Sequence, residues 1–202
     1  MPSIYQLKPA FQAVLRPCVR LLAKAGVTAN TVTVTAAVLS VAVGACIAAW
    51  GDHRWPLLLL PAFLLLRMAL NAIDGMLARE HGMRSRLGAI LNELGDVVSD
   101  AALYLPLALV AVFDPKLLVV IVVLAVISEM TGVLGVAVGA QRRYDGPMGK
   151  SDRAAVFAVL GLWLGLGGTG GLWLTVVLGM VALLLVATTV NRARQALKHG
   201  KG

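Results

Sequence analysis

Charged side chains are scarce in this sequence: only 14% of its 202 residues are Asp, Glu, Lys or Arg, whereas 59% are hydrophobic. A soluble domain carries about a quarter charged residues, so this composition excludes an ordinary soluble protein. Long apolar runs fill most of the chain, and crossing ~30 Å of hydrocarbon takes about 20 residues. We therefore expect an all-α polytopic membrane protein with six transmembrane helices. Their expected positions are 31–50, 56–78, 88–112, 117–139, 153–168 and 172–191.

Cysteine is also rare in this sequence. Cys18 and Cys46 are isolated, without C-x-x-C spacing, which favours small apolar packing groups over a disulfide or a metal site. The amino terminus lacks the apolar core of a cleavable signal peptide, so we expect none. The apolar runs leave no room for a separate soluble domain.

Positive charge is distributed unevenly among the expected connections. The net charge is +8, and 15 of the 18 Lys and Arg residues lie in the amino-terminal segment, in 79–86, in 142–153 and in the carboxyl-terminal tail. The other connections carry only Arg54 and Lys116, and Arg67 lies within a span. The positive-inside rule places both termini and the basic loops in the cytoplasm. This distribution indicates an orientation in a membrane rather than binding to nucleic acid.

Residues 3–25 predict an amphipathic helix instead of a span. Polar side chains recur every fourth residue on one face, and apolar side chains line the other. Such a helix lies in the headgroup plane, where anionic lipid attracts it, although simple packing on neighbouring helices is an alternative. Pro9 and Pro17 should kink or break the helix, and Gly26 should end it. The polar face comprises Lys8, Gln12, Arg16, Arg20 and Lys24.

Amide and acidic side chains recur at helical spacing at the inner ends of the second and third spans. Asn71 and Asp74 share one helix face with Ala78. A carboxylate in or near a bilayer is costly and marks an ion, substrate or proton site. Two facing helices that both offer oxygen ligands suit a hard cation such as Mg2+. The stripe on the third span consists of Asn92, Asp96 and Asp100.

This stretch resembles the signature of the CDP-alcohol phosphotransferase family, D-x-x-D-G-x-x-A-R-x8-G-x-x-x-D-x-x-x-D. The spacing matches throughout, with asparagine at two of the four aspartate positions, Asn71 and Asn92. The resemblance implies transfer of a phosphatidyl or other alkyl-phosphate group from a CDP-alcohol to an acceptor alcohol, with release of CMP. CDP-diacylglycerol is the donor that we expect, and phospholipid biosynthesis is the expected process.

The resemblance also implies roles for individual residues. Asp96 would be the catalytic base, and Mg2+ or Mn2+ would be the cofactor. The expected metal ligands are Asn71, Asp74, Asn92, Asp96 and Asp100. The nucleotide would lie against Asn30, Thr33, Asp74, Gly75, Ala78, Arg79 and Gly88.

Two of these groups have a simpler structural interpretation as well. Asn30 and Thr33 lie in a segment similar to the family's P-N-x-x-T sequence before its first membrane helix, but capping by Thr28 or Asn30 would explain this segment equally well. Gly75 and Ala78 lack bulk, which suits close approach of a pyrimidine and its diphosphate or close packing of helices.

The loop before the fifth span is the second informative stretch. Its Gly-Lys-Ser-Asp-Arg sequence at 149–153 resembles the start of the fifth helix in phosphatidylinositol-phosphate-type members, where this helix holds the phosphate of the acceptor. The resemblance implies acceptor binding by Arg142, Lys150 and Arg153. An ordinary positive-inside loop is the alternative, with Ser151 or Asp152 as a helix cap.

Charged residues inside the spans need partners. Arg67 lies on the motif face, and Glu129 is the one carboxylate in the fourth span. A structural Arg67–Glu129 pair is the expected arrangement, with direct contact of either residue with substrate as the alternative. Glu93 lies off the acidic stripe and should cap a helix or pair with a nearby arginine.

The expected organisation has three parts: an amphipathic juxtamembrane helix at 1–30, a six-helix catalytic domain at 31–191 and a basic cytoplasmic tail at 192–202. We expect a homodimer, which the family resemblance implies, in a bacterial inner membrane, with the active site facing the cytoplasm. A catalytically silent scaffold that binds nucleotide or lipid is the alternative that the two asparagines favour. A cation-coupled transporter fits less well, because the carboxylates cluster near one membrane face.

Overall fold

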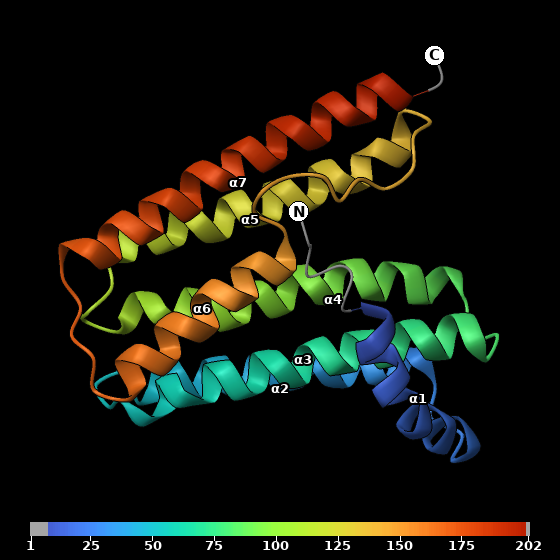
Figure 1. Ribbon diagram of the computed structural model, residues 1–202, viewed down its shortest axis with the longest axis horizontal. Coiled ribbons are helices and arrows are strands. Elements are labelled where there is room, and N and C mark those ends of the chain that lie inside the picture. The colour runs from blue at the N-terminus through green and yellow to red at the C-terminus, as the bar shows by residue number, and fades with distance from the viewer. Residues whose placement is uncertain (1–7, 201–202) are drawn as a thin grey trace.

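The computed structural model describes residues 8–200, and within this range the regular structure is entirely helical. Figure 1 shows the helices arranged as a bundle, with α1 crossing one end of it. The elements are α1 (Lys8–Lys24), α2 (Ala29–Ala49), α3 (Trp55–Glu80), α4 (Arg86–Tyr104), the 3-10 helix η2 (Leu105–Leu109), α5 (Pro115–Ala137), α6 (Lys150–Gly165) and α7 (Leu172–His199).

Four helices of the described range are long and apolar enough to cross a membrane: α2, α3, α5 and α7. The remaining two bundle helices, α4 and α6, are 19 and 16 residues long. These spans indicate a multi-pass membrane protein. The count of six transmembrane spans remains a prediction.

The helix boundaries differ from the expected ones in two places. The third helix ends at Tyr104 and continues as a 3-10 helix, because Pro106 cannot donate the hydrogen bond that an α-helix requires there. The last helix continues to His199, so the described part of the basic tail is helical. Arg192, which the sequence places in the tail, is only 2% exposed.

The bundle consists of two packed groups that share a core. In Figure 1, α5 and α7 run side by side, apart from the layer that α2, α3 and α4 form, and α6 packs on α3. Buried side chains of all six bundle helices form one apolar cluster between these groups. The closest approach is at Gly44, where a Cβ would lie 1.9 Å from the carbonyl oxygen of Ala102. Gly44 therefore allows α2 and α4 to pack in direct backbone contact.

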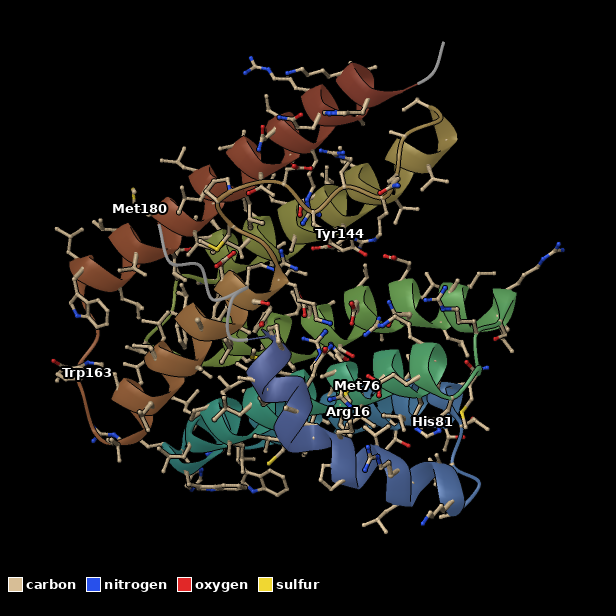
Figure 2. All side chains as sticks on the ribbon, turned by 45° about the vertical axis from the view of Figure 1, so that its right-hand side comes forward. Arg16, Met76, His81, Tyr144, Trp163 and Met180 are labelled. Atoms are coloured by element: carbon tan, nitrogen blue, oxygen red, sulfur yellow. The ribbon has the colours of Figure 1, made fainter. Side chains whose placement is uncertain are left out.

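The amphipathic helix α1 packs on the end of the bundle where the α3–α4 turn lies. Val19 is fully buried against Ile73, Met76 and Leu77 of α3, and Figure 2 shows Met76 beneath this helix. The helix is continuous through Pro17, so the expected break is absent, and it ends at Gly26 with φ +75°, as predicted. Val14 and Leu21 remain exposed on its outer side. Location in the headgroup plane remains a prediction, and residues 3–7 lie outside the described residues.

The connections gather at two opposite ends of the bundle. Figure 1 shows the α3–α4 turn, the end of α5 and the end of α7 at one end, where α1 also lies. The α2–α3 and α6–α7 connections lie at the other end. These are the same two groups that the distribution of Lys and Arg separates. The loop between α5 and α6 runs back along α5, so α6 begins near the middle of the bundle.

Candidate active site

The two halves of the motif face one another across α3 and α4, and α2 closes one side. Thr33 of α2 donates a hydrogen bond from Oγ1 to Asp74 Oδ2 at 2.8 Å, while the same hydroxyl lies 3.1 Å from the carbonyl oxygen of Ala29. Asp74 is only 5% exposed. The hydroxyl of Thr33 therefore fixes the orientation of a buried carboxylate on the neighbouring helix.

Three side chains from α3 and α6 contact Asp96. Asn71 Nδ2 donates to Asp96 Oδ1 at 3.4 Å, which links α3 to α4. Lys150 at the start of α6 forms an ion pair with the same oxygen. Arg67 donates to the backbone carbonyl of Asp96 at 3.0 Å, and its guanidinium lies 3.8 Å from Oδ1. The structure thus brings together the predicted base, one predicted ligand and one predicted acceptor-binding residue.

These residues suit one divalent cation better than two. Within the described residues no three Asp, Glu, His or Cys side chains gather at one place, and the motif offers two carboxylates together with two amides. Mg2+ commonly binds one or two carboxylates and completes its shell with water and substrate phosphates. On donor chemistry, Asp74 and Asp96 would suit a single cation, with Asn71 close to Asp96 and Lys150 paired with Asp96 Oδ1. Asn92 is exposed on α4.

The residues predicted to bind nucleotide lie around the inner ends of α2, α3 and α4. Gly88 packs so closely on Asn30 that a Cβ would lie 2.7 Å from Asn30 Oδ1. A Cβ at Gly75 would lie 3.0 Å from the guanidinium of Arg79, which is exposed. Thr28 caps α2, because its side chain accepts a hydrogen bond from the backbone of Thr31 at 3.1 Å. Capping thus involves Thr28, and the side chain of Asn30 packs against Gly88.

Asp100 is paired with arginines on two helices. Its Oδ1 forms an ion pair with Arg67 of α3, and its Oδ2 accepts from Arg153 of α6 at 2.6 Å. All three side chains are at least 95% buried. Both carboxylate oxygens of Asp100 are therefore occupied by arginines. The expected Arg67–Glu129 pair is wrong, because Asp100 on the adjacent helix lies within reach of Arg67.

Glu129 of α5 is instead surrounded by arginines from three other segments. Its carboxylate lies 3.0 Å from Arg142, 3.1 Å from Arg153 and 3.2 Å from Arg192. Arg192 is a site residue that the sequence analysis missed, since it was counted only as a tail charge. The signal that could have found it is Glu129 itself, because a lone carboxylate in an apolar helix requires a cation.

The loop before α6 is held by ion pairs and by an aromatic ring. Arg142 donates to Glu93 of α4 at 2.7 Å and lies 4.2 Å from the ring centre of Tyr144, which Figure 2 labels beside α5. Burial disfavours the charged guanidinium, but the hydrogen bond to Glu93 and the nearby carboxylates raise the pKa of Arg142 above its ordinary value. The expected pairing of Glu93 with an arginine is confirmed.

The helix start at 149–153 has the expected cap. Asp152 Oδ2 accepts a hydrogen bond from the backbone of Gly149 at 2.9 Å. Because this cap fixes the first turn of α6, Lys150 and Arg153 are directed to Asp96 and Asp100 on α4. Lys150, Arg153 and Arg142 therefore lie on one connected set of ion pairs.

Comparison with curated proteins identifies relatives along most of the chain. It is 42% identical over 195 residues to inner membrane protein YnbA of Escherichia coli, covering 96% of both chains. Phosphatidylinositol phosphate synthase of Corynebacterium glutamicum is 33% identical over 104 residues, covering 52% of this chain and 45% of the relative. The synthase of Mycolicibacterium smegmatis is 26% identical over 169 residues, covering 81% and 74%.

Solved structures with the same fold come from phosphatidylinositol phosphate synthase (PgsA1) of Mycobacterium tuberculosis. The structure with CDP-DAG bound aligns with a TM-score of 0.75 at 22% identity, covering 89% of this chain and 92% of that chain. The structure with manganese and citrate also gives 0.75 at 22% identity, covering 90% and 88%. The family model for CDP-alcohol phosphatidyltransferase matches residues 26–190, which is most of the described bundle. The chain therefore belongs to the CDP-alcohol phosphatidyltransferase family.

Proposed function

We propose that the chain transfers a phosphatidyl or other alkyl-phosphate group from a CDP-alcohol, with CDP-diacylglycerol as the donor, to an acceptor alcohol and releases CMP. The observation that carries this proposal is the arrangement of Asp74, Asn71 and Asp96 on facing helices. The family match and the exposed apolar surface of the membrane-spanning helices support a lipid donor. The process that this reaction serves is phospholipid biosynthesis.

Asp96 acts as the base in this proposal. The backbone carbonyl of Asp96 is held by Arg67 at 3.0 Å, and its side chain is 22% exposed, so an acceptor hydroxyl can reach it. The carboxylate takes the hydroxyl proton while the oxygen attacks the phosphorus bound to the lipid alcohol. The bond from this phosphorus to the CMP oxygen breaks, and CMP leaves with that oxygen.

Asp74, Asp96 and Asn71 would hold a divalent cation, Mg2+ or Mn2+, with Asn92 as an additional predicted ligand. Asp100 is also a predicted ligand, but both of its carboxylate oxygens are bound by Arg67 and Arg153. When bound, the cation neutralises the charge of the diphosphate and of the departing CMP. Thr33 positions the Asp74 carboxylate through its 2.8 Å hydrogen bond.

The nucleotide binds at the inner ends of α2, α3 and α4 in this proposal. Gly75 and Ala78 leave room for the nucleotide beside the backbone of α3, and Gly88 allows the close approach of Asn30 to α4. Asn30 and Arg79 offer polar contacts to the nucleotide. Asp74 and Thr33 are the other residues of the proposed nucleotide site. A second copy of the chain as a homodimer partner, a cytoplasmic active site and cytoplasmic termini are further parts of the proposal, supported by family resemblance and by charge distribution.

The experiment is an assay of the purified chain in detergent with CDP-diacylglycerol, other CDP-alcohols and a panel of acceptor alcohols. We expect CMP and a phospholipid product that contains both the diacylglycerol phosphate and the acceptor. CMP from a different CDP-alcohol alone would correct the donor. No CMP from any donor with Mg2+ or Mn2+ would contradict transfer.

A scaffold that binds nucleotide or lipid without catalysis is the second candidate. The specific observation that favours it is the pair of amides at Asn71 and Asn92, together with the ion pair between Lys150 and Asp96. This candidate predicts that the chain binds CDP-diacylglycerol without releasing CMP. Measuring donor binding alongside CMP release therefore separates the two functions.

A further inference from the structure

We propose that the acceptor is an uncharged alcohol and not a phosphorylated one, because Glu129 already occupies the position where the arginines of the acceptor side would bind an anion. This inference rests on the proposed transfer reaction and names the class of its acceptor. The residues concerned are the Glu129 cluster, which comprises Glu129, Arg142, Arg153 and Arg192.

The cluster resembles an anion-binding site in which the Glu129 carboxylate is itself the bound anion. Its guanidinium groups come from the loop before α6, from α6 and from α7, and they lie between 3.0 and 3.2 Å from the Glu129 carboxylate. Arg153 and Arg192 are 1% and 2% exposed, and Glu129 is 7% exposed. Three arginines around one acidic group are the arrangement by which proteins hold phosphate. Here the acidic group is a side chain of the chain itself.

Each arginine of the cluster has a further partner besides Glu129. Arg142 also pairs with Glu93, and Arg153 also pairs with Asp100. Arg192 donates to the carbonyl oxygen of Ser128 at 2.7 Å. Each guanidinium of the cluster is therefore bound on at least two sides.

The remaining cations on this side of Asp96 are engaged as well. Lys150 pairs with Asp96, and Arg67 pairs with Asp100. Across the described residues of this network, five cations meet four carboxylates. A phosphate group at the cluster would therefore compete with Glu129 and Asp96 for cations that already carry partners. Displacement would leave a buried carboxylate without a counterion, which is strongly unfavourable.

An uncharged alcohol encounters no such obstacle. Its hydroxyl can approach the partly exposed Asp96 without separating any buried ion pair. Glu129 is in this view a specificity-determining residue that acts through the arginines, and not a group that touches the reacting atoms. A neutral residue at this position would turn the cluster into a site for a phosphate group.

The first experiment compares matched acceptors with the full-length wild-type chain, CDP-diacylglycerol and Mg2+. The pairs are glycerol with glycerol 3-phosphate and inositol with inositol phosphate. We expect kcat/KM for the better uncharged acceptor to exceed that for its phosphorylated counterpart by at least about 100-fold. Equal use of both members, or preference for the phosphorylated one, would overturn the proposal.

The second experiment measures binding of radiolabelled inorganic phosphate to the same protein in EDTA, so that it needs neither turnover nor metal. We expect Glu129→Gln to bind phosphate at least about tenfold more tightly than the wild-type chain. Asp145→Asn is the matched control. This substitution removes the partner of Arg143, an arginine of the same loop that lies outside the cluster and 2.8 Å from the Asp145 carboxylate. The variant should gain no phosphate affinity.

The two experiments separate failure of this inference from failure of the proposed function. If no acceptor yields CMP, transfer fails, and phosphate binding still tests the Glu129 cluster. Two results would refute the proposal that Glu129 takes the place of a bound anion. One is a folded Glu129→Gln variant with unchanged phosphate affinity, and the other is wild-type protein that binds phosphate as tightly as this variant. If Glu129→Gln does not fold, wild-type phosphate affinity decides: binding in the micromolar range refutes the inference, and absence of binding supports it.

Discussion

Single residues of the motif are held in different ways, and these differences decide what each can do. Asp74 is buried and oriented by Thr33, whereas Asp96 is partly exposed and contacted by Lys150. Both oxygens of Asp100 are occupied by arginines. Spacing in the sequence could predict that Asn71, Asp74 and Asp96 face one another. It could not predict which carboxylate each arginine binds. Several helices carry carboxylates, and the sequence does not show which of them pack beside each arginine.

Restoring the two missing charges of the motif should strengthen metal binding. The double variant Asn71→Asp with Asn92→Asp adds two carboxylates to the helices that carry Asp74 and Asp96. We expect the Mg2+ concentration at half-maximal CMP release to fall about tenfold, since ligand charge sets the affinity of a hard-cation site. A titration of CMP release against Mg2+ measures this value. An unchanged or raised requirement would show that these positions do not face the cation.

The buried ion pairs of Asp100 should contribute strongly to stability. Asp100→Asn removes the nearest counterion of Arg67 and one of the two counterions of Arg153, which are 2% and 1% exposed. We expect a loss of about 3 kcal/mol in the free energy of unfolding in detergent, because two buried guanidinium groups each lose an ion pair. The matched control is Asp145→Asn, whose partner Arg143 is partly exposed. A similar small effect in both variants would contradict the assigned burial.

At the scale of elements, helix positions follow from hydrophobic runs, whereas helix ends follow from local capping and tertiary contacts. The apolar segments predicted all six bundle helices within a few residues, except that α4 is shorter and α7 longer than predicted. Pro106 gives a physical reason for the early end of α4. The extension of α7 to His199 includes Arg192, which pairs with Glu129 of the neighbouring α5, a contact that the sequence of α7 alone does not indicate.

The approach of α2 to α4 should be intolerant of a single methyl group. Gly44→Ala would place a Cβ 1.9 Å from the Ala102 carbonyl oxygen, so the helices would have to separate. We expect destabilisation of about 1–3 kcal/mol, measured as a lower thermal midpoint in detergent. The control is Gly179→Ala in α7, where a Cβ would meet nothing within 4 Å. An equal response of both variants would exclude close packing of α2 on α4 as the cause.

At the scale of the whole molecule, basic connections gather at one end of the bundle and the motif lies toward that end. The separation of the two groups of connections in Figure 1 agrees with the charge distribution of the sequence. The all-helical class and the family were therefore accessible from hydropathy and motif spacing. The continuous ion-pair network from Arg67 to Arg192 was not, because it joins residues from five segments that only the folded chain brings together.

Reporter fusions in a bacterial host test the orientation of the molecule. A fluorescent protein that folds only in the cytoplasm should fluoresce when fused after residue 202. Alkaline phosphatase, which is active only outside the cytoplasm, should be active when fused after Asp52 in the α2–α3 connection. The positive-inside rule gives this direction. The reverse pattern of the two reporters would place the motif on the outer face and contradict a cytoplasmic active site.

Metal-dependent release of CMP tests the central claim most directly. Purified full-length chain is incubated with CDP-diacylglycerol and the acceptor panel, with Mg2+ or with EDTA, beside an Asp96→Asn variant of matched folding. We predict release of CMP with Mg2+, none with EDTA, and a rate about 10²–10⁴-fold lower in the variant, because the base is lost. Equal CMP release by Asp96→Asn would remove Asp96 as the base, and absence of CMP from the wild-type chain would contradict catalysis itself.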